Sequence, residues 1–266
     1  MGKKTYFISS DIHSFYDEYL LSLSNAGFDK ENDDHIIIIC GDLFDRGEQT
    51  VELFDFIVSI PEHRRILIKG NHEDLLEEIF ENGYLQSYDV SNGTVKTISA
   101  FCNKPDSFVF SNLSACYAIM ENKGVWDLLK SMKNYAEIGD YIFVHGWIPT
   151  NHVLTDTFQM VHKFNKKWRE ASDTDWSEAR WTNGMLAYFE NCGEANKTIV
   201  CGHWHSSYGH VYKKYKGCSP KEQYQLQFAE DACFDPFYDT KYKKSIIALD
   251  ACTAHTRKVN VIKLEI

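Results

Sequence analysis

Long apolar runs are missing from this 266-residue sequence: none approaches the roughly 18 residues of a membrane-spanning helix, so no membrane span is predicted. The 8 cysteines form no CxxC pair, and the first residues form no cationic leader followed by an apolar stretch. These absences argue against a disulfide framework and against a secretory signal. We therefore expect reduced thiols and a cytoplasmic protein.

Basic residues are also in deficit, since 28 Lys and Arg stand against 38 Asp and Glu, for a formal net charge of −10. Proteins that bind nucleic acid usually present a basic surface, so nucleic acid is not an expected partner. Bound divalent cations would offset part of this negative charge. Internal repeats and linkers are absent too, and a hydrophobic content of 44% suits a sizeable core. The sequence thus predicts a single domain over residues 1–266 and carries no signal of oligomeric state.

The first third of the sequence alternates between strand-like and helix-like segments. Apolar, β-branched runs cover residues 5–10, 35–40 and 64–70, and helix-like stretches cover residues 14–27, 48–60 and 73–83. Ser14 stands where the N-cap of the first helix is expected. Short connections between such segments predict βαβ units and an α/β fold.

This pattern weakens over about residues 84–135, where Gly, Asn, Ser and aromatic residues mix without a clear period, and we predict a cap or insertion with its own short helices. Strand-like runs return at residues 137–149, 195–207, 210–215, 245–252 and 258–266. Several late strands with few helices favour a second sheet packed on the first. Two stretches that alternate aromatic and charged residues, 162–170 and 231–244, are interpreted as amphipathic surface segments rather than as a lip over a substrate.

Polar side chains gather where five of the strand-like runs end. They are Asp11 and His13; Asp42, Asp45 and Arg46; Asn71 and His72; His145; and His203 and His205. Ligands of open α/β sheets bind at the carboxyl ends of the strands, so these residues are expected to share one rim. Carboxylates, an amide and imidazoles suit divalent Zn, Mn or Fe, and an aspartate can bridge two ions ~3.5–4 Å apart. We therefore predict a site for two divalent metal ions.

Each cluster alone has a plainer interpretation. The pair "GD" after a strand is commonly a turn, an isolated histidine is commonly structural, and "GHWH" fits a loop with a packed tryptophan. In combination, and each at a strand end, the clusters favour a site. Within "GDLFDRG", Gly41 lets the chain turn, Asp42 is placed to bridge two ions, and the planar guanidinium of Arg46 suits phosphate oxygens.

The segments "DIH", "GDLFDRG", "GNHE", "HG" and "GHWH", in this order, resemble the calcineurin-like metallophosphoesterases. The resemblance is greatest to the phosphoprotein phosphatase branch, which includes bacterial and phage Ser/Thr phosphatases and symmetrical diadenosine tetraphosphatases. It implies a four-layer α/β/β/α sandwich with two packed mixed β-sheets. It also implies hydrolysis of phosphomonoesters, phosphoproteins included, by a hydroxide that bridges two metal ions.

The alternatives within the enzyme class are a nucleotide pyrophosphohydrolase of the diadenosine-tetraphosphate type and a phosphodiesterase acting on nucleotides. From another class, the protein could be a scaffold that has kept the fold without catalysis. Intact Asn71, His72, Asp42 and Asp45 argue against a scaffold. The expected partner is a phosphorylated protein or a small phosphoester or nucleotide.

The resemblance also implies a role for each matching residue. The implied metal ligands are Asp11, His13 and His205 for the first ion, Asp42 as the bridge, and Asn71, His145 and His203 for the second. His72 is similar to the general acid of the family, and Asp45 to the residue that orients it. The implied phosphate-binding residues are Arg46, Asn71, Arg180 in "DWSEARW", and Lys69. For Arg180, a surface salt bridge is nearly as good an interpretation.

Several positions depart from the pattern of the branch. Ser10 and Ser14 replace glycines in "SDIHS", and Lys69 replaces an arginine, which keeps the charge but loses the bidentate fork. Trp147, in "HGW", is expected to pack under the insertion, or else to narrow the mouth of the site or stack on a substrate ring. His205 completes a "GHxH" that belongs to the wider superfamily, which places the sequence in an outlying group.

Overall fold

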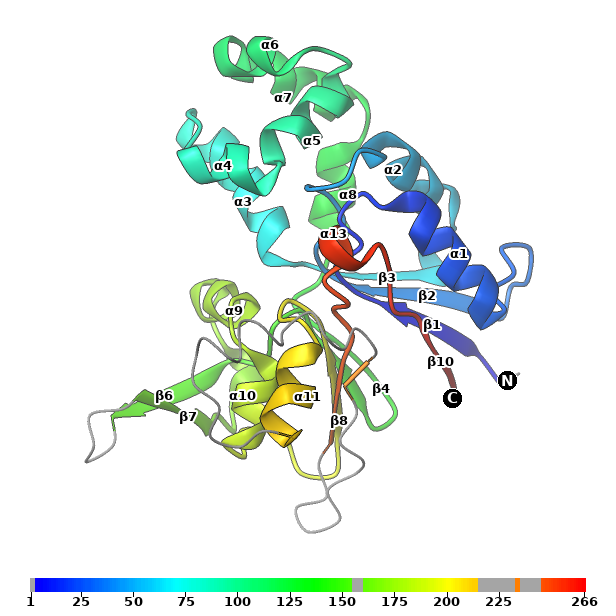
Figure 1. The fold of residues 1–266 in the computed structure, drawn as a ribbon, viewed down its shortest axis with the longest axis vertical. Helices are drawn as coiled ribbons and strands as arrows, with labels where there is room; N and C mark the ends of the chain where they lie inside the picture. Colours follow the sequence, from blue (N-terminus) through cyan, green and yellow to red (C-terminus); the bar gives the residue numbers. More distant parts are fainter. Residues whose placement is uncertain (1–2, 155–159, 215–232, 235–244) are drawn as a thin grey trace.

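The computed structural model describes residues 3–154, 160–214, 233–234 and 245–266, and its strands form two four-stranded sheets (Figure 1). The first sheet has the order β10-β1-β2-β3, with β1–β3 parallel and β10 antiparallel to β1. The second has the order β4-β5-β8-β9, with β5, β8 and β9 parallel and β4 antiparallel to β5. Their bounds are β1 Thr5–Ser9, β2 His35–Cys40, β3 Arg65–Ile68, β10 Ile262–Glu265, β4 Ala136–Ile138, β5 Tyr141–Phe143, β8 Thr198–Cys201 and β9 Ser245–Ala248.

Helices cover the outer faces of both sheets. Those packed on the first sheet are α1 Tyr16–Ala26, α2 Thr50–Ser59 and α3 Asn71–Asn82, with η1 Glu62–Arg64 between α2 and β3. Those on the second sheet are α9 Asp173–Arg180, α10 Gly184–Phe189 and α11 Ser207–Lys214, with η2 Trp168–Glu170 before them. A hairpin of β6 Thr150–Leu154 and β7 Met160–Phe164 projects from this half, and the short α13 Thr253–Thr256 follows β9.

The alternation of side chains along β2 shows how the layers form. Ile37 and Ile39 point into the core beneath the helices, while Ile38 and Cys40 point between the two sheets. This period of two is that of a strand buried on both faces. Phe143 and other inward residues of the second sheet close the layer between the sheets. The predicted α/β/β/α sandwich of two mixed sheets is thus confirmed.

The segment predicted as an insertion is helical. It contains α4 Ser87–Asn92, α5 Thr94–Cys102, α6 Asp106–Ser111, α7 Leu113–Asn122 and α8 Val125–Ser131, gathered at one end of the molecule (Figure 1). These helices share a core with the first sheet, since the Phe101 ring lies 5.2 Å from Phe44 and 5.5 Å from Phe54. The description of residues 84–135 as a cap stays a prediction.

Three local predictions are wrong. Residues 210–215 were expected to form a strand, but Ser207–Lys214 is the helix α11, because Tyr208 and Tyr212 fall four positions apart and Tyr212 stacks on Phe189 at 4.2 Å. Ser14 does not cap α1: its hydroxyl lies 2.9 Å from that of Thr50. Residues 137–149 do not form one strand, because the chain turns at Gly139, with φ 58°, between β4 and β5.

Within the described ranges, no helix combines the length and apolar character needed to cross a bilayer. Seven cysteines lie among those residues, and six of them are buried. The amphipathic segment predicted at 231–244 lies outside the described residues except for 233 and 234.

Candidate metal centre and catalytic site

In the loops that follow β1, β2 and β8, several residues adopt left-handed backbone conformations. Asp11, His13, Asp42, Asp45 and His203 have φ of 53°, 52°, 56°, 72° and 66°. Such conformations cost about 1–3 kcal/mol each for residues other than glycine, and they cluster at functional sites. The loops after β1 and β2 hold each other in place, because the His13 amide donates to the Asp42 carbonyl at 3.1 Å.

His13 belongs to the first of two groups of side chains that could hold a metal ion. Ligand atoms of His13, Asp42 and His72 lie within 4.8 Å of one another. The Nδ1–H of His13 donates to the Phe44 carbonyl at 2.9 Å, which turns Nε2 toward the Asp42 carboxylate, 3.7 Å away. That Nε2 is buried and has no hydrogen-bond partner among the described residues. Burial, with Arg46 and His72 nearby, keeps the pKa of His13 well below its usual value, so its lone pair is available to a cation.

The second group contains Asp42 again, with His145 and His203. His145 donates from Nδ1 to the Cys40 carbonyl at 2.7 Å, and its Nε2 lies 2.8 Å from Asn71 Oδ1 and 3.3 Å from Asp42. Burial, and then His145, lowers the pKa of His203 to about 3. The group therefore offers two imidazoles, an amide oxygen and a carboxylate, a donor set that suits Mn, Fe or Zn.

Asp42 is the one member that the two groups share. Burial alone would raise the pKa of its carboxyl, but the imidazoles of His145 and His72 outweigh burial and hold the pKa well below its usual range. Asp42 is thus a buried carboxylate in its ionised form between two clusters of imidazoles. This is the arrangement that a bridge between two cations requires.

Asp11 lies beside the second group without being part of it. Its carboxylate accepts the His203 amide at 3.0 Å and contacts the Ser10 hydroxyl. Burial raises the pKa of Asp11 to about 6, against the attraction of His145. A Cβ at Gly202 would collide with the Ser10 hydroxyl and the Asp11 carboxylate, which explains the glycine in "GHWH". The serine that replaces a glycine in "SDIHS" is therefore a neighbour of the predicted ligand.

His205 lies apart from both groups. Its Nε2 is 3.8 Å from the carboxylate of Asp250, and burial, and then Arg46, lowers its pKa to about 4. Burial, and then Asp11, raises the pKa of Asp250 well above its usual value. Sequence analysis did not single out Asp250, although it follows β9 as the other polar residues follow their strands.

His72, a member of the first group, forms a hydrogen-bonded pair with Asp45. The Nδ1–H of His72 donates to Asp45 Oδ2 at 2.7 Å, and Arg46 Nη2 lies 3.2 Å from His72 Nε2. Burial alone would lower the pKa of His72, but Asp42 and Asp45 outweigh it and raise the pKa to about 8. The imidazole therefore holds a proton at neutral pH, as a general acid must.

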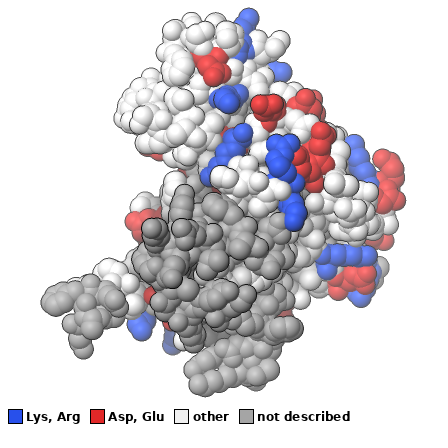
Figure 2. Space-filling model, viewed as in Figure 1, with Lys and Arg blue, Asp and Glu red and all other residues white. Residues whose placement is uncertain are grey.

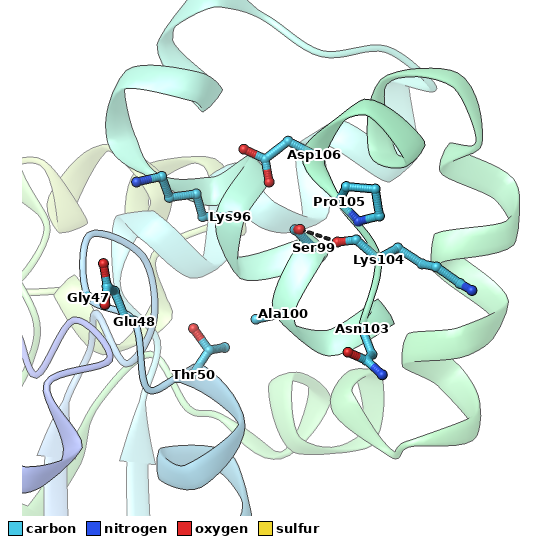
Figure 3. Close-up of a pocket in the computed structure, with 10 residues that line it drawn as sticks. All are labelled: Gly47, Glu48, Thr50, Lys96, Ser99, Ala100, Asn103, Lys104, Pro105 and Asp106. Atoms are coloured by element: carbon cyan, nitrogen blue, oxygen red, sulfur yellow. Dashed lines mark hydrogen bonds between the residues drawn. The ribbon is translucent and has the colours of Figure 1, made fainter.

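Two further side chains form hydrogen bonds with this pair, and sequence analysis missed them. The hydroxyls of Thr94 and Thr97, on α5, donate to the Asp45 carboxylate at 2.7 Å each. The other side of α5 lines a hollow of about 560 Å³ (Figure 3), which Lys96 and Ser99 share with the loop after β2. The helix thus stands between that hollow and the Asp45 carboxylate.

The structure places the two outlying phosphate-binding candidates in ion pairs. Arg180 donates to Asp74 at 2.8 Å and to Asn134 at 2.5 Å, and Lys69 donates to Glu77 at 2.5 Å and lies 2.9 Å from Asp74. All five line an open groove of about 800 Å³ between α3 and α9. A phosphate-binding role for Arg180 and Lys69 stays a prediction, with carboxylates as their partners in this structure.

The predictions for Trp147 are wrong. Its side chain is 1% exposed, in the core beneath the second sheet, and its Nε1–H donates to the Cys192 carbonyl at 3.4 Å. It therefore neither narrows the mouth of the site, nor stacks on a substrate, nor packs under the insertion. The exposed indoles near His203 are Trp181 and Trp204, at 50% and 42%, with rings 5.6 and 6.5 Å from the imidazole.

Surface charge is mixed on the face shown in Figure 2. Over the described part of that face, basic and acidic side chains alternate, mostly above the first sheet and its helices.

Glu73, the last residue of "GNHE", ties two of the loops together. Its carboxylate accepts the backbone amides of Asp42 at 3.0 Å, Leu43 at 2.8 Å and Gly70 at 2.8 Å. Glu73 is 1% exposed, so no solvent replaces these bonds. The sequence signal for it is a glutamate at the third position of a helix, where a carboxylate commonly reaches back to the helix start.

Glu73→Ala is expected to lower the free energy of unfolding by about 3 kcal/mol or more, because each buried amide left without a partner costs about 1–3 kcal/mol. Urea unfolding of the metal-free protein measures this. Glu78→Ala, at an exposed position of the same helix, is the control and should change stability by no more than about 0.5 kcal/mol. Equal stabilities for the two variants would remove the loop-tying role from Glu73.

The chain is similar to known proteins in sequence and in fold. The sequence profile of the calcineurin-like phosphoesterases matches residues 5–235, and the chain belongs to that family. The resemblance carried by the strand-end segments is thereby confirmed. Among curated relatives, the chain is 31% identical over 101 residues to the asymmetrical bis(5′-nucleosyl)-tetraphosphatase PrpE of Anoxybacillus flavithermus, a match that covers 35% of this chain and 40% of that protein.

Two further similarities bear on the branch and the fold. The symmetrical bis(5′-nucleosyl)-tetraphosphatase of Buchnera aphidicola is 28% identical over 117 residues, covering 44% of this chain and 39% of that protein. The matches thus span about two fifths of these relatives. The solved structure of a cold-active protein-tyrosine phosphatase from Shewanella sp. superposes with a TM-score of 0.52 at 18% identity, covering 99% of this chain and 76% of that one, which shows the common fold.

Proposed function

We propose that the protein is a phosphatase that hydrolyses phosphomonoesters, including phosphoserine and phosphothreonine in proteins, with two divalent ions from the set Mn, Fe and Zn. The observation that carries the proposal is that Asp42 is shared by two groups of ligand side chains, one of which contains His72 in its hydrogen bond to Asp45. The ligands proposed for the two ions are Asp11, His13, Asp42, Asn71, His145, His203 and, less centrally placed, His205.

Each residue has a distinct part in the proposed reaction. The bound ions would activate a water molecule and neutralise charge on the phosphoryl group. Arg46, an exposed guanidinium beside His72, binds two phosphoryl oxygens and holds the group in line. His72, oriented by Asp45, donates its Nε2 proton to the leaving oxygen. This proton matters most for serine and threonine alkoxides, which are poor leaving groups.

A second candidate is a nucleotide pyrophosphohydrolase of the diadenosine-tetraphosphate type, or a nucleotide phosphodiesterase. Two observations favour it. The curated relatives carry the name bis(5′-nucleosyl)-tetraphosphatase. Trp181 and Trp204 also present exposed indole rings beside His203, and such rings can stack on nucleobases.

An activity panel with added Mn²⁺ separates these candidates. It compares a phosphoserine peptide, diadenosine tetraphosphate, bis-p-nitrophenyl phosphate and a 2′,3′-cyclic nucleotide, with EDTA-treated protein as the blank. The phosphopeptide is expected to have the highest kcat/KM. A higher value for the dinucleotide, lost in Trp181→Ala and Trp204→Ala, would establish the second candidate instead. Protein that binds ions and hydrolyses none of the four would be a scaffold.

A further inference from the structure

We propose that Thr94 and Thr97 are positioning residues of the reaction: they fix the carboxylate of Asp45 so that His72 presents its proton to the leaving group. The inference deepens the proposed function and rests on it. It gives the helical segment after α3 an indirect part in catalysis, through the contact of α5 with Asp45.

Both oxygens of Asp45 are occupied. Oδ1 accepts the Thr97 hydroxyl at 2.7 Å, and Oδ2 accepts the Thr94 hydroxyl and the His72 Nδ1–H, each at 2.7 Å. The Asp45 amide in turn donates to the Thr97 oxygen at 3.0 Å. Thr94, Thr97 and Asp45 are 0%, 1% and 2% exposed, so no bulk water competes for these bonds. Hydrogen bonds to a carboxylate are of the strong, charge-assisted kind.

The sequence of α5 suits its contact with Asp45. Thr94 and Thr97 are three positions apart, which places both hydroxyls on one face of the helix. Gly93, with φ 93°, precedes the helix, and a Cβ there would lie 2.6 Å from the amide nitrogen of Arg46. Only glycine lets the start of α5 approach the loop this closely. The stretch "GTVKT" therefore combines close approach with two correctly spaced hydroxyls.

The loop that carries Asp45 cannot orient the carboxylate by itself. Asp45 and Arg46 have φ of 72° and 61°, and the Asp45 side chain extends from this strained turn. A carboxylate free to rotate would present either oxygen, or neither, to His72 Nδ1. Two hydroxyls at fixed positions define its plane and leave Oδ2 facing the imidazole. The orientation of the protonated His72 ring follows, because an Nδ1–H held by Asp45 Oδ2 leaves the Nε2–H directed toward the substrate.

The test uses Thr94→Val and Thr97→Val, singly and combined, in the full-length protein loaded with Mn²⁺. Valine keeps the shape of threonine and removes the hydroxyl. We expect the double variant to lose about 10–100-fold in kcat on an alkyl phosphate, the range found when partners that orient a site residue are removed. On p-nitrophenyl phosphate, whose leaving group needs little protonation, the loss should stay within about three-fold.

Two sets of variants separate positioning from general loosening of the helices. Thr94→Ser and Thr97→Ser keep the hydroxyls and should restore the alkyl phosphate rate. Val109→Ala, a core truncation in α6 remote from Asp45, should lower thermal stability without changing the ratio of the two rates. Mn²⁺ uptake, measured by calorimetry, should match the wild type in the threonine variants.

The outcomes decide separately about the inference and the function on which it rests. A selective loss on the alkyl phosphate, restored by serine, supports the positioning role. Equal losses on both substrates, no loss, or failure of serine to restore the rate would overturn it while leaving the phosphatase intact. If the double variant does not fold, the single variants give the same comparison. A wild-type protein that takes up Mn²⁺ but hydrolyses neither substrate would overturn the function and the inference together.

Discussion

Asp42→Asn is expected to take up one divalent ion where the wild type takes up two, and to lose about 1,000-fold or more in phosphoesterase rate, which corresponds to ~4 kcal/mol of barrier. The reason is the shared position of Asp42 between the groups of His13 and of His145. An amide has one coordinating oxygen and no charge, so it cannot offset the repulsion between two cations in a buried site.

Elemental analysis of the loaded protein, together with initial rates on p-nitrophenyl phosphate, checks this expectation. Asp55→Asn, at an exposed position of α2, is the matched control and should keep two ions and the full rate. Circular dichroism confirms that the Asp42 variant is folded. Full occupancy by two ions and a near-normal rate in that variant would mean that Asp42 does not bridge.

His72→Ala is expected to lose about 10³-fold on an alkyl phosphate but no more than about ten-fold on p-nitrophenyl phosphate, because general acid catalysis contributes about 10²–10⁴-fold where the leaving group needs a proton. The geometry behind this is the His72–Asp45 bond of 2.7 Å, which orients the imidazole. Loss of the His72 imidazole should leave the proposed metal ligands in place, so the ion content of the variant is expected to equal that of the wild type.

Steady-state kinetics on both substrates, with the same Mn²⁺ concentration, measure this difference. His63→Ala is a suitable control, since His63 is an exposed histidine on η1. Equal losses on the two substrates would take the acid role away from His72 and point to an effect on the ions instead.

The central part of the site followed from the sequence because it depends on strand ends. Polar residues directly after buried strands come together whenever the strands are parallel neighbours, and β1, β2 and β3 are such neighbours. His145 and His203 follow β5 and β8, which are parallel neighbours in the second sheet, and the packing of the two sheets brings these strand ends to Asp42. The same reasoning covers Asp250, which follows β9 and could have been included.

Other contacts around the site depend on partners that no local pattern reveals. Thr94 and Thr97 look like ordinary helix residues until α5 is placed against Asp45. Arg180 and Lys69 carry the charge expected for phosphate, but the neighbouring turns of α3 offer carboxylates at shorter range. In both cases the tertiary contact decides, and the sequence signal is the same for either outcome.

The prediction of secondary structure was wrong where the periodicities of a strand and of a helix compete. The stretch "HVYKKY" contains β-branched and aromatic residues at positions that suit a strand, yet Tyr212 stacks on Phe189 and on Tyr208, which precedes it by one helical turn. Trp147 was misplaced for another reason: its position near His145 suggests the mouth of the site, but β5 ends at Phe143, and the loop that follows turns the Trp147 side chain into the core.

The bond between the His203 amide and the Asp11 carboxylate joins positions separated by 192 residues. Pairing of β10 with β1 likewise connects opposite ends of the chain, from Thr5 to Glu265. Such a high contact order makes folding slow, because closing long loops costs entropy before the contacts compensate. A partly folded chain can therefore contain most of its helices and still lack the proposed metal centre, and the proposed hydrolysis would be a late indicator that both ends of the polypeptide have docked.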